Sequence, residues 1–530
     1  MVENMTEFDS LPANAQSFIK SVIKKIRYRK KVRADVFEEI VSHFTDQLED
    51  INDITQRQQA AEKLIADFGQ PDLLAKLIRR GKKRCRPLWK KVLIVSFQTT
   101  CILVLFIGLR ISTFYIGKPS IKIDYGKWLT EKASAGKDPN LNAKIDIDRA
   151  IELADFDFDK ITWILNILPE DMNDVQLQQA KKYLVENTQT INALRDAANK
   201  LYFWVDYDNP DYEQVSLHKA NFIDGTAATS NDYMETLSNW RHLAGMMALN
   251  IRIEVYSGQT DQAIKDWFVL QKFAGFFQGQ GFLVDQLVAM GIEGLSCNTI
   301  NDVLSHAEVS QSQLVNIQEY FEKNVKKDKR VINWIGEKAL WFDEIQRAFT
   351  DNGQGDGRVL ANGLRFIAKD NSSFIRGFVL GGYHGKKETI DEIEKFFNQV
   401  DSFSQQTPFQ RYQQQLKITS NLFVFNTLTA PYEQIAMISW RLRTSRLALL
   451  TTIAIKRYQQ ETRQLPASLQ QLVDSGYLDE LPMDPFSDGP LIYKTTKDDF
   501  VLYSVGIDCK DNGGKIEYLD NGRVKGWKGE

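Results

Sequence analysis

An uncharged apolar run, Val92 to Leu109, constrains this chain more than any other feature of its sequence. As a helix, the run would be about 27 Å long, which is close to the hydrocarbon thickness of a bilayer. Trp89 before the run and Tyr115 after it suit the aromatic belts at the two membrane surfaces. A buried core helix is the alternative, but shorter runs favour it. The sequence therefore predicts one transmembrane helix within residues 89–117.

Basic residues gather at one end of this run. Residues 79–91 hold eight Lys and Arg, whereas only Arg110, Lys118 and Lys122 follow closely on the other side. Because positive residues stay in the cytoplasm, we expect residues 1–88 to be cytoplasmic and the C-terminal domain to be periplasmic. The first fifteen residues are acidic and polar, so we expect the apolar helix to act as an uncleaved signal anchor in the inner membrane.

Composition limits the partners and the covalent links. Residues 1–91 carry 19 Lys and Arg against 13 Asp and Glu, although the whole chain has a net charge of −3. A basic segment beside a membrane predicts contact with anionic lipid, and nucleic-acid binding is the weaker alternative. Four cysteines are too few for a disulfide scaffold. Cys297 and Cys509 both follow the apolar helix, where one bridge or two separate thiols are open alternatives.

The first 88 residues predict a small helical domain. Its clearest helix repeats an apolar residue every fourth position, at Val36, Ile40, Phe44 and Leu48. An alanine-rich helix, an F-G-x-P turn and a short helix follow. This order resembles the permease-prefix (HAAS-type) domain, which implies a signalling or regulatory role beside a membrane segment. The residues that carry the resemblance are Glu39, Ile40, His43, Phe44, Asp46, Phe68, Gly69, Pro71, Leu74 and Ala75.

Beyond the membrane helix, we expect a polar connector at 118–140 and a large helical domain at 141–440. Helical patterns dominate this second stretch. Ser310 with Gln313 forms a capping-box pattern that begins one of its helices. A glycine-rich stretch at 351–363 predicts a surface loop.

One helical pair in this domain has a repeat-like pattern. A first helix ends at Gly258, and Thr260 can cap the second. Ala263, Trp267 and Leu270 would lie on the inner face of the second helix. The pair resembles one tetratricopeptide-type hairpin, which implies neighbouring helices that bury its faces.

Residues 441–530 predict a small α+β module. A helix precedes Pro466, a shorter one follows, and turn residues separate short strands at 491–494 and 500–505. The motif order resembles the soluble part of type II secretion major pseudopilins. Such proteins join this part directly to a membrane helix, whereas here about 330 residues intervene, so we do not expect a pilus subunit. The residues that carry the resemblance are Tyr458, Leu465, Pro466, Ser468, Leu469, Asp484, Pro485, Tyr493, Ser504, Gly506, Asp508, Asp511, Gly513 and Gly514.

The pseudopilin resemblance implies a calcium site. Relatives of that family often hold calcium just after an S-x-G-x-D sequence, and here Asp508 and Asp511 are the candidate ligands. Calcium takes six to eight oxygens, so Glu517 or Asp520, backbone carbonyls and water would have to complete the shell. The alternative is a turn in which the carboxylates accept hydrogen bonds from backbone amides.

Motifs that would carry catalysis are incomplete. The five histidines have no paired metal-ligand spacing. GLSCN around Ser296 departs from a nucleophile elbow, and GGYHGKK near Gly385 departs from a phosphate loop. DFDFDK at 155–160 suits a solvated loop or helix start. Four tryptophans suit packing better than a ligand groove: Trp240, Trp267, Trp334 and Trp341.

The whole organisation is therefore expected to be mainly α: a helical head, one membrane helix, a repeat-like helical domain and an α+β module. This combination resembles large membrane proteins of planctomycete-type bacteria. It favours an envelope-side scaffold or binding protein that is not an enzyme, with envelope or membrane proteins as partners. The alternatives are a secretion or pilus-associated component and a hydrolase whose site is assembled from distant residues.

Overall fold

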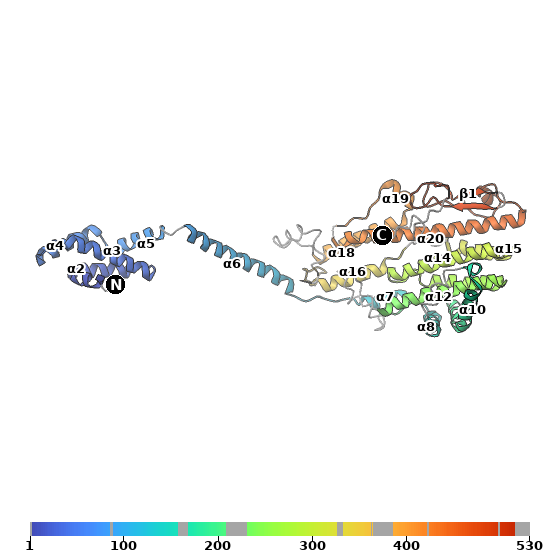
Figure 1. Cartoon of the computed structure of the whole chain (residues 1–530), viewed down its shortest axis with the longest axis horizontal. Helices are drawn as coiled ribbons and strands as arrows, with labels where there is room; N and C mark the ends of the chain where they lie inside the picture. The colour runs from blue at the N-terminus through green and yellow to red at the C-terminus, as the bar shows by residue number, and fades with distance from the viewer. Residues whose placement is uncertain are drawn as a thin grey trace. The chain divides into compact units, whose positions relative to one another are not determined.

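A computed structural model describes residues 3–84, 88–156, 168–207, 231–325, 332–361, 363, 385–420, 423–496 and 499–514. The chain divides into two units, Met1–Ile111 and Ser112–Glu530. Within the described ranges the chain is mainly helical and has one two-stranded sheet (Figure 1). The predicted fold class is confirmed at this level.

The first unit contains a small helical domain with an apolar core. The predicted stripe is buried, since Phe44 and Leu48 are fully shielded from solvent. Phe44 stacks on Phe68 with ring centroids 5.4 Å apart. Gly69 then turns the chain at a φ of 76°. The helices are α1 (Glu3–Ser10), α2 (Ala13–Lys25), α3 (Lys30–Leu48), α4 (Ile54–Phe68) and α5 (Pro71–Arg84).

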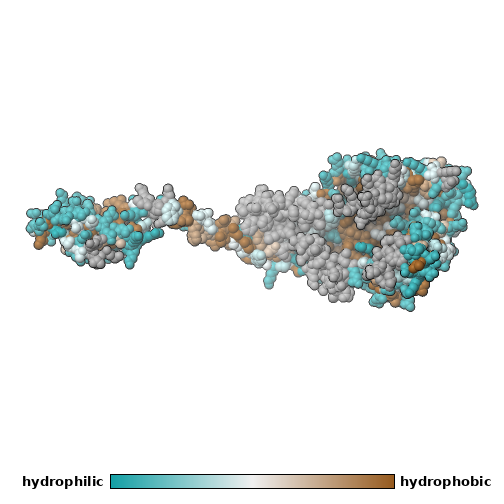
Figure 2. Space-filling view, viewed as in Figure 1, coloured by the Kyte–Doolittle hydropathy of each residue, from teal (hydrophilic) through white to brown (hydrophobic). Residues whose placement is uncertain are grey.

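Helix α6 (Leu88–Tyr115) carries the apolar run. Its segment Lys91–Tyr115 is long and apolar enough to cross a membrane, and no other described helix is. Apolar side chains along it are exposed, as Phe97 is at 70%. Figure 2 shows this stretch as an apolar surface. A helix of this length with such side chains unburied is consistent with one that spans a membrane.

The second unit, which we call the body, is built on long helices that lie side by side (Figure 1). Helices α12, α13 and α14 pack on one another, and α20 packs on α14 and α15. The bounds of the body helices are α7 (Tyr125–Ser134), α8 (Lys144–Leu153), α10 (Asp174–Glu186), α11 (Thr188–Ala198), α12 (Asn231–Tyr256), α13 (Thr260–Phe276), α14 (Leu283–His306), α15 (Gln311–Val325), α16 (Ile335–Ala348), α18 (Lys386–Gln405), α19 (Pro408–Gln414), α20 (Phe423–Thr462) and α21 (Leu469–Asp474), with short 3₁₀ turns η1 (Pro139–Leu141) and η2 (Pro169–Asp171).

The expected hairpin is α12 with α13. Ala263, Trp267 and Leu270 are fully buried, as predicted. Thr260, however, is the first residue of α13, and Gln259 precedes it without a side-chain cap. The expected cap is therefore wrong by one position, because the turn after Gly258 is closed by backbone hydrogen bonds instead. The predicted capping box at Ser310 is present.

The segment expected to be a polar connector is partly helical. It contains α7, and Leu129 on this helix is buried in the main core of the body. The backbone just before α7 is also fixed. The Gln346 side-chain oxygen accepts hydrogen bonds from Lys122 N (3.0 Å) and Ile123 N (3.3 Å), and its nitrogen donates to the Ile123 carbonyl. Helix α7 has only 10 residues, so it repeats an apolar pattern too few times to stand out in the sequence. This explains why the sequence predicted a connector here.

The C-terminal region is continuous with the body. The expected boundary at 440/441 lies inside α20, which runs through 40 residues. Neither Gly nor Pro occurs between Tyr432 and Leu465 to end the helix. The strands β1 (Ile492–Thr495) and β2 (Phe500–Tyr503) pair antiparallel near the positions predicted for them. Leu491, before β1, is buried in the same core as α14.

Candidate functional site

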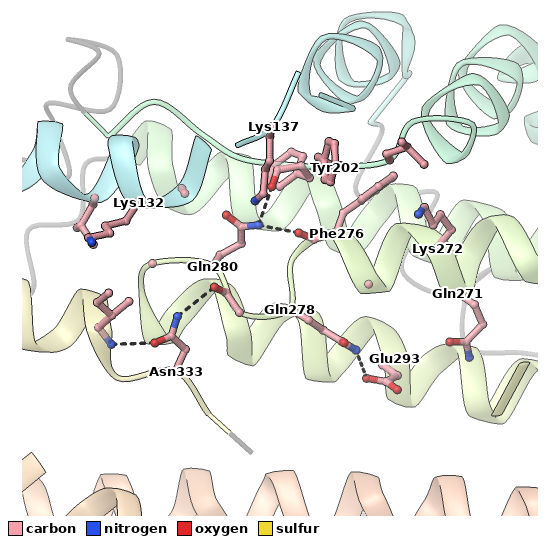
Figure 3. A pocket seen from close by; sticks show the side chains of 18 of the residues that line it. Lys132, Lys137, Tyr202, Gln271, Lys272, Phe276, Gln278, Gln280, Glu293 and Asn333 are labelled. Atoms are coloured by element: carbon pink, nitrogen blue, oxygen red, sulfur yellow. Dashed lines mark hydrogen bonds between the residues drawn. The ribbon is translucent and has the colours of Figure 1, made fainter. Parts of the chain in front are cut away.

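A cavity of about 670 Å³ lies in the body, within the size range of small-molecule sites (Figure 3). Its wall comes from segments far apart in the sequence: α7, the loop at 201–207, α13, the turn at 278–281, α14, α15 and α20. Because these segments all pack into one core, the cavity has a preformed frame.

The turn between α13 and α14 shapes one wall of this cavity. The Gln280 side chain donates hydrogen bonds to the carbonyls of Phe203 (3.1 Å) and Phe276 (2.8 Å). Gly281 N donates to the Tyr207 hydroxyl at 2.8 Å. A Cβ on Gly281 would lie 2.8 Å from that hydroxyl, so a larger residue would push the turn off Tyr207. Glycine at 281 therefore allows this close approach.

A buried ion pair lies in the wall of this cavity. Arg446 on α20 pairs with Glu293 on α14, and each residue is less than a tenth exposed. Gln278 donates a hydrogen bond to the second Glu293 oxygen at 2.6 Å (Figure 3). An adjoining cavity of about 240 Å³ shares both charged residues. The pair therefore fixes α14 against α20 where the two cavities meet.

Two protonated groups surround this ion pair. Burial, followed by the nearby charge of Glu293, raises the pKa of the Cys297 thiol to about 12. The same two causes raise the pKa of Tyr320 to about 12. A thiol with such a pKa is a poor nucleophile at neutral pH. Cys297 and Cys509 are both free thiols here, which matches the alternative of two separate cysteines.

Four lysines line the cavity: Lys132, Lys137, Lys272 and Lys323. Among the residues that the structure describes, no carboxylate forms an ion pair with any of them. Lys137 instead lies 5.8 Å from the ring of Tyr202, and Lys272 lies 5.4 Å from that of Phe276. Partial burial lowers the pKa of the Lys137 ammonium group below its usual value. The wall therefore carries positive charge that is not balanced locally.

A buried amide adds a donor to this wall. Gln271 on α13 is 4% exposed and lines the cavity. Its Nε2 atom is buried and has no hydrogen-bond acceptor within the described ranges. Leaving such a donor unsatisfied costs about 1–3 kcal/mol, so a ligand that accepts its hydrogen bond would gain affinity. The cavity can thus hold a small molecule through lysine ammonium groups and an amide donor.

The predicted calcium ligands lie in a turn after β2. Asp508 accepts a hydrogen bond from Lys510 N at 3.2 Å. Asp511 accepts from Gly513 N (2.8 Å) and from the Tyr503 hydroxyl (2.9 Å), and these bonds lower the pKa of Asp511. Carboxylates that accept hydrogen bonds from backbone amides are what we expected of a turn without calcium. No group of three metal-ligating side chains occurs among the described residues, and Glu517 and Asp520 lie outside them. Calcium binding stays a prediction.

Other residues of the C-terminal motifs have structural contacts. Asp484 is 2% exposed and accepts hydrogen bonds from Phe486 N, from the Ser504 hydroxyl and from Val505 N, at 2.9 to 3.0 Å. The Tyr493 hydroxyl donates to the Pro466 carbonyl at 2.8 Å. These contacts tie the chain before β1 to the chain after β2.

The remaining sequence candidates do not meet in a site. Ser296 is fully buried in the middle of α14, where a substrate has no access. Lys386 begins α18 and pairs with Asp351 at 3.2 Å, while the rest of the glycine-rich motif before Gly385 lies outside the described residues, as do residues 157–160. The four tryptophans are at most 5% exposed and pack in the core, as Trp240 does by stacking on Phe277.

Sequence reasoning missed the cavity. Its lysines are scattered from residue 132 to residue 323, and two of them fall at or near the segment expected to be a connector. A usable signal did exist. Gln271 lies four residues after the buried Trp267, and Glu293 lies four residues after the buried Ala289, so each interrupts an apolar stripe.

Comparison of the chain with protein-family models, with curated proteins and with solved structures finds no match in any of the three. The resemblances to the permease-prefix domain and to pseudopilins therefore stay expectations from the sequence.

Proposed function

We propose that this chain is a single-pass membrane protein whose body is an envelope-side binding module for a small molecule. The observation that carries the proposal is the cavity with Gln271 and the four unpaired lysines in its wall. Burying a donor without an acceptor and gathering like charges both destabilise an empty site. A ligand that accepts the hydrogen bond of Gln271 and balances the charge of the lysines would stabilise the body.

The anchoring part of the proposal rests on α6 and its flanks. An exposed apolar helix of this length suits a bilayer, and the basic residues of 79–91 suit the cytoplasmic surface and its anionic lipid. In this proposal residues 1–88 lie in the cytoplasm and the body lies on the envelope side of the inner membrane. The body could also bind envelope or membrane proteins through surfaces other than the cavity.

A cavity-blocking variant tests the binding role. Gly275 lies on α13 in the cavity wall, and a Cβ there would meet no atom within 4 Å, so Gly275→Trp can enter the space without disturbing the fold. Gly291→Trp is the matched control, because Gly291 is also helical, exposed and unobstructed but lies outside this wall. Both variants would be purified from native membranes beside the unaltered chain, and the small molecules released by denaturation would be identified by mass spectrometry.

The proposal predicts a compound that co-purifies with the unaltered chain and with Gly291→Trp at comparable amounts. Gly275→Trp should lose at least nine tenths of it, since the indole would occupy the ligand volume. A compound retained by all three proteins, or one absent from all three, would contradict the cavity as the binding site. Melting of the three proteins without ligand controls for misfolding.

A further inference from the structure

We infer that the ligand of this cavity is a small multivalent anion, bearing phosphate or carboxylate groups, that Lys137 and Lys272 bind directly. This inference rests on the proposed function and names the ligand class. It depends on the charge of the wall, on the hydrogen-bond donors in it, and on where the lysines lie.

The charges in the wall are strongly one-sided. The lining includes the four lysines and Arg446, and Glu293 is the single acidic residue among its described members. Glu293 already pairs with Arg446, so its charge is neutralised within the wall. The lysines therefore add a local charge of about +4 with no counterion from the described protein, in a body whose overall charge is negative. An anionic ligand is the complement of such a wall.

The hydrogen-bond chemistry points the same way. Lysine ammonium groups only donate, and the Gln271 amide nitrogen also only donates. Phosphate and carboxylate groups only accept when they are ionised, so they satisfy all of these groups at once. A protonated amine would bring only donors toward these donors, and a neutral sugar could accept their hydrogen bonds but would leave the positive charge unbalanced. The burial of Gln271 and the partial burial of Lys137 and Lys272 strengthen their bonds relative to the same bonds in water.

The lysines surround the cavity from different elements. Lys132 and Lys137 come from α7 and the loop after it, Lys272 from α13 and Lys323 from α15. Figure 3 shows Lys132 and Lys137 on one side of Phe276 and Lys272 on the other. A ligand with two or more charges can reach both sides. The lowered pKa of Lys137 agrees with this, because a bound anion would offset the burial of its charge.

Titration calorimetry on the full purified chain tests the inference with defined probes. Inorganic pyrophosphate and citrate serve as the phosphate and carboxylate arms, each at the same ionic strength set with sodium chloride. Glucose serves as the neutral probe. Three variants are compared with the unaltered chain: Lys137→Gln, Lys272→Gln and Lys265→Gln. Lys265 is exposed on α13 outside the cavity wall, so it controls for loss of one lysine charge from the same helix.

The expected result is binding of pyrophosphate, of citrate or of both, and none of glucose. Lys137→Gln and Lys272→Gln should each raise the Kd about tenfold, whereas Lys265→Gln should leave it within twofold. The arm that binds more tightly identifies the anion as phosphate or carboxylate. Absence of binding by both anions, or equal binding by all three variants, would overturn the inference. The blocking experiment with Gly275→Trp judges the proposed function separately, since it needs no assumption about charge.

Discussion

The first unit and the body of this protein differ in what their cores contain. Every buried side chain described in residues 3–84 is apolar, and the core there joins aromatic and aliphatic residues from all five helices. Among the residues that the structure describes, the buried polar and charged side chains all lie in the body, from Asn187 to Asp484. A buried polar group destabilises a fold unless it finds a partner. The body must therefore specify many partners, and Gln271 in the cavity wall carries one buried donor that lacks a partner among the described residues.

This contrast distinguishes a unit with an apolar core from a body that buries polar side chains and for which we propose a binding role. In the first unit, a stripe such as Phe44 with Leu48 is enough to bring the helices together. In the body, α13 and α14 bury Gln271, Asp266 and Glu293 among apolar residues, which a stability requirement alone would not select.

The largest expected effect comes from the buried ion pair. Arg446→Ala should lower the free energy of unfolding of the body by about 3–5 kcal/mol, because Glu293 would stay buried without its charged partner. Glu186→Ala is the matched control, since it removes an exposed pair with Lys182 and should cost less than about 1 kcal/mol. Denaturant unfolding followed by tryptophan fluorescence measures both. Equal effects would show that the buried pair has no special role in the body.

In the first unit, Phe44→Ala should cost about 3 kcal/mol, because the ring is fully buried and its removal leaves a cavity. Hydrogen exchange should then speed up in α2, α3 and α4, while α13 and α14 keep their protection. Loss of protection in α13 and α14 as well would mean that the two units fold as one and that their cores are not independent.

A third prediction concerns pH. Glu254 on α12 is buried, and burial, followed by the charge of Asp266, raises the pKa of Glu254 to about 8. A carboxyl whose pKa is higher in the folded state stabilises the fold at low pH and loses that contribution as pH rises through 8. The Arg195 guanidinium, which binds Asp266 through two hydrogen bonds, is the charged group facing both acids.

Glu254→Gln should remove this dependence and keep the hydrogen bond from Asn250, which the amide oxygen can still accept. Between pH 5 and pH 9 the body should lose about 2 kcal/mol more stability in the unaltered chain than in the variant. The measurement is denaturant unfolding at a series of pH values. Parallel stability curves for the two proteins would contradict the raised pKa.

The smallest effect is expected at the turn after β2. If calcium binds Asp508 and Asp511, millimolar calcium should raise the melting temperature of the full chain by about 2 °C, and Asp508→Ala should abolish the shift. The full chain is needed because α20 continues from the body into this region. Melting that is indifferent to calcium in both proteins would leave only the amide-accepting turn. Asp499→Ala, in the loop between the strands, is the control for losing a nearby carboxylate.

The same contrast explains what could be predicted from the sequence. Apolar periodicity predicted α3 and α13, and an uncharged apolar run predicted α6, because both signals depend only on neighbours along one helix. It did not predict α7, whose packing depends on Leu129 meeting a core assembled mainly from later residues. The cavity lysines follow no local pattern, since Lys137 and Lys323 line one cavity only because the segments that carry them join the same core. Polar residues within apolar stripes, such as Gln271 and Glu293, were the one local sign of the site.

We propose that α6 crosses the inner membrane once, with residues 1–88 on one side and the body on the other. The most direct test fuses alkaline phosphatase, which is active only outside the cytoplasm, after Gly81 and after Lys137 in otherwise identical chains, and compares its activity at matched expression. The account predicts activity after Lys137 and none after Gly81, because the basic residues of 79–91 hold the first unit in the cytoplasm. Activity after Gly81 and none after Lys137, or activity at neither position, would contradict it.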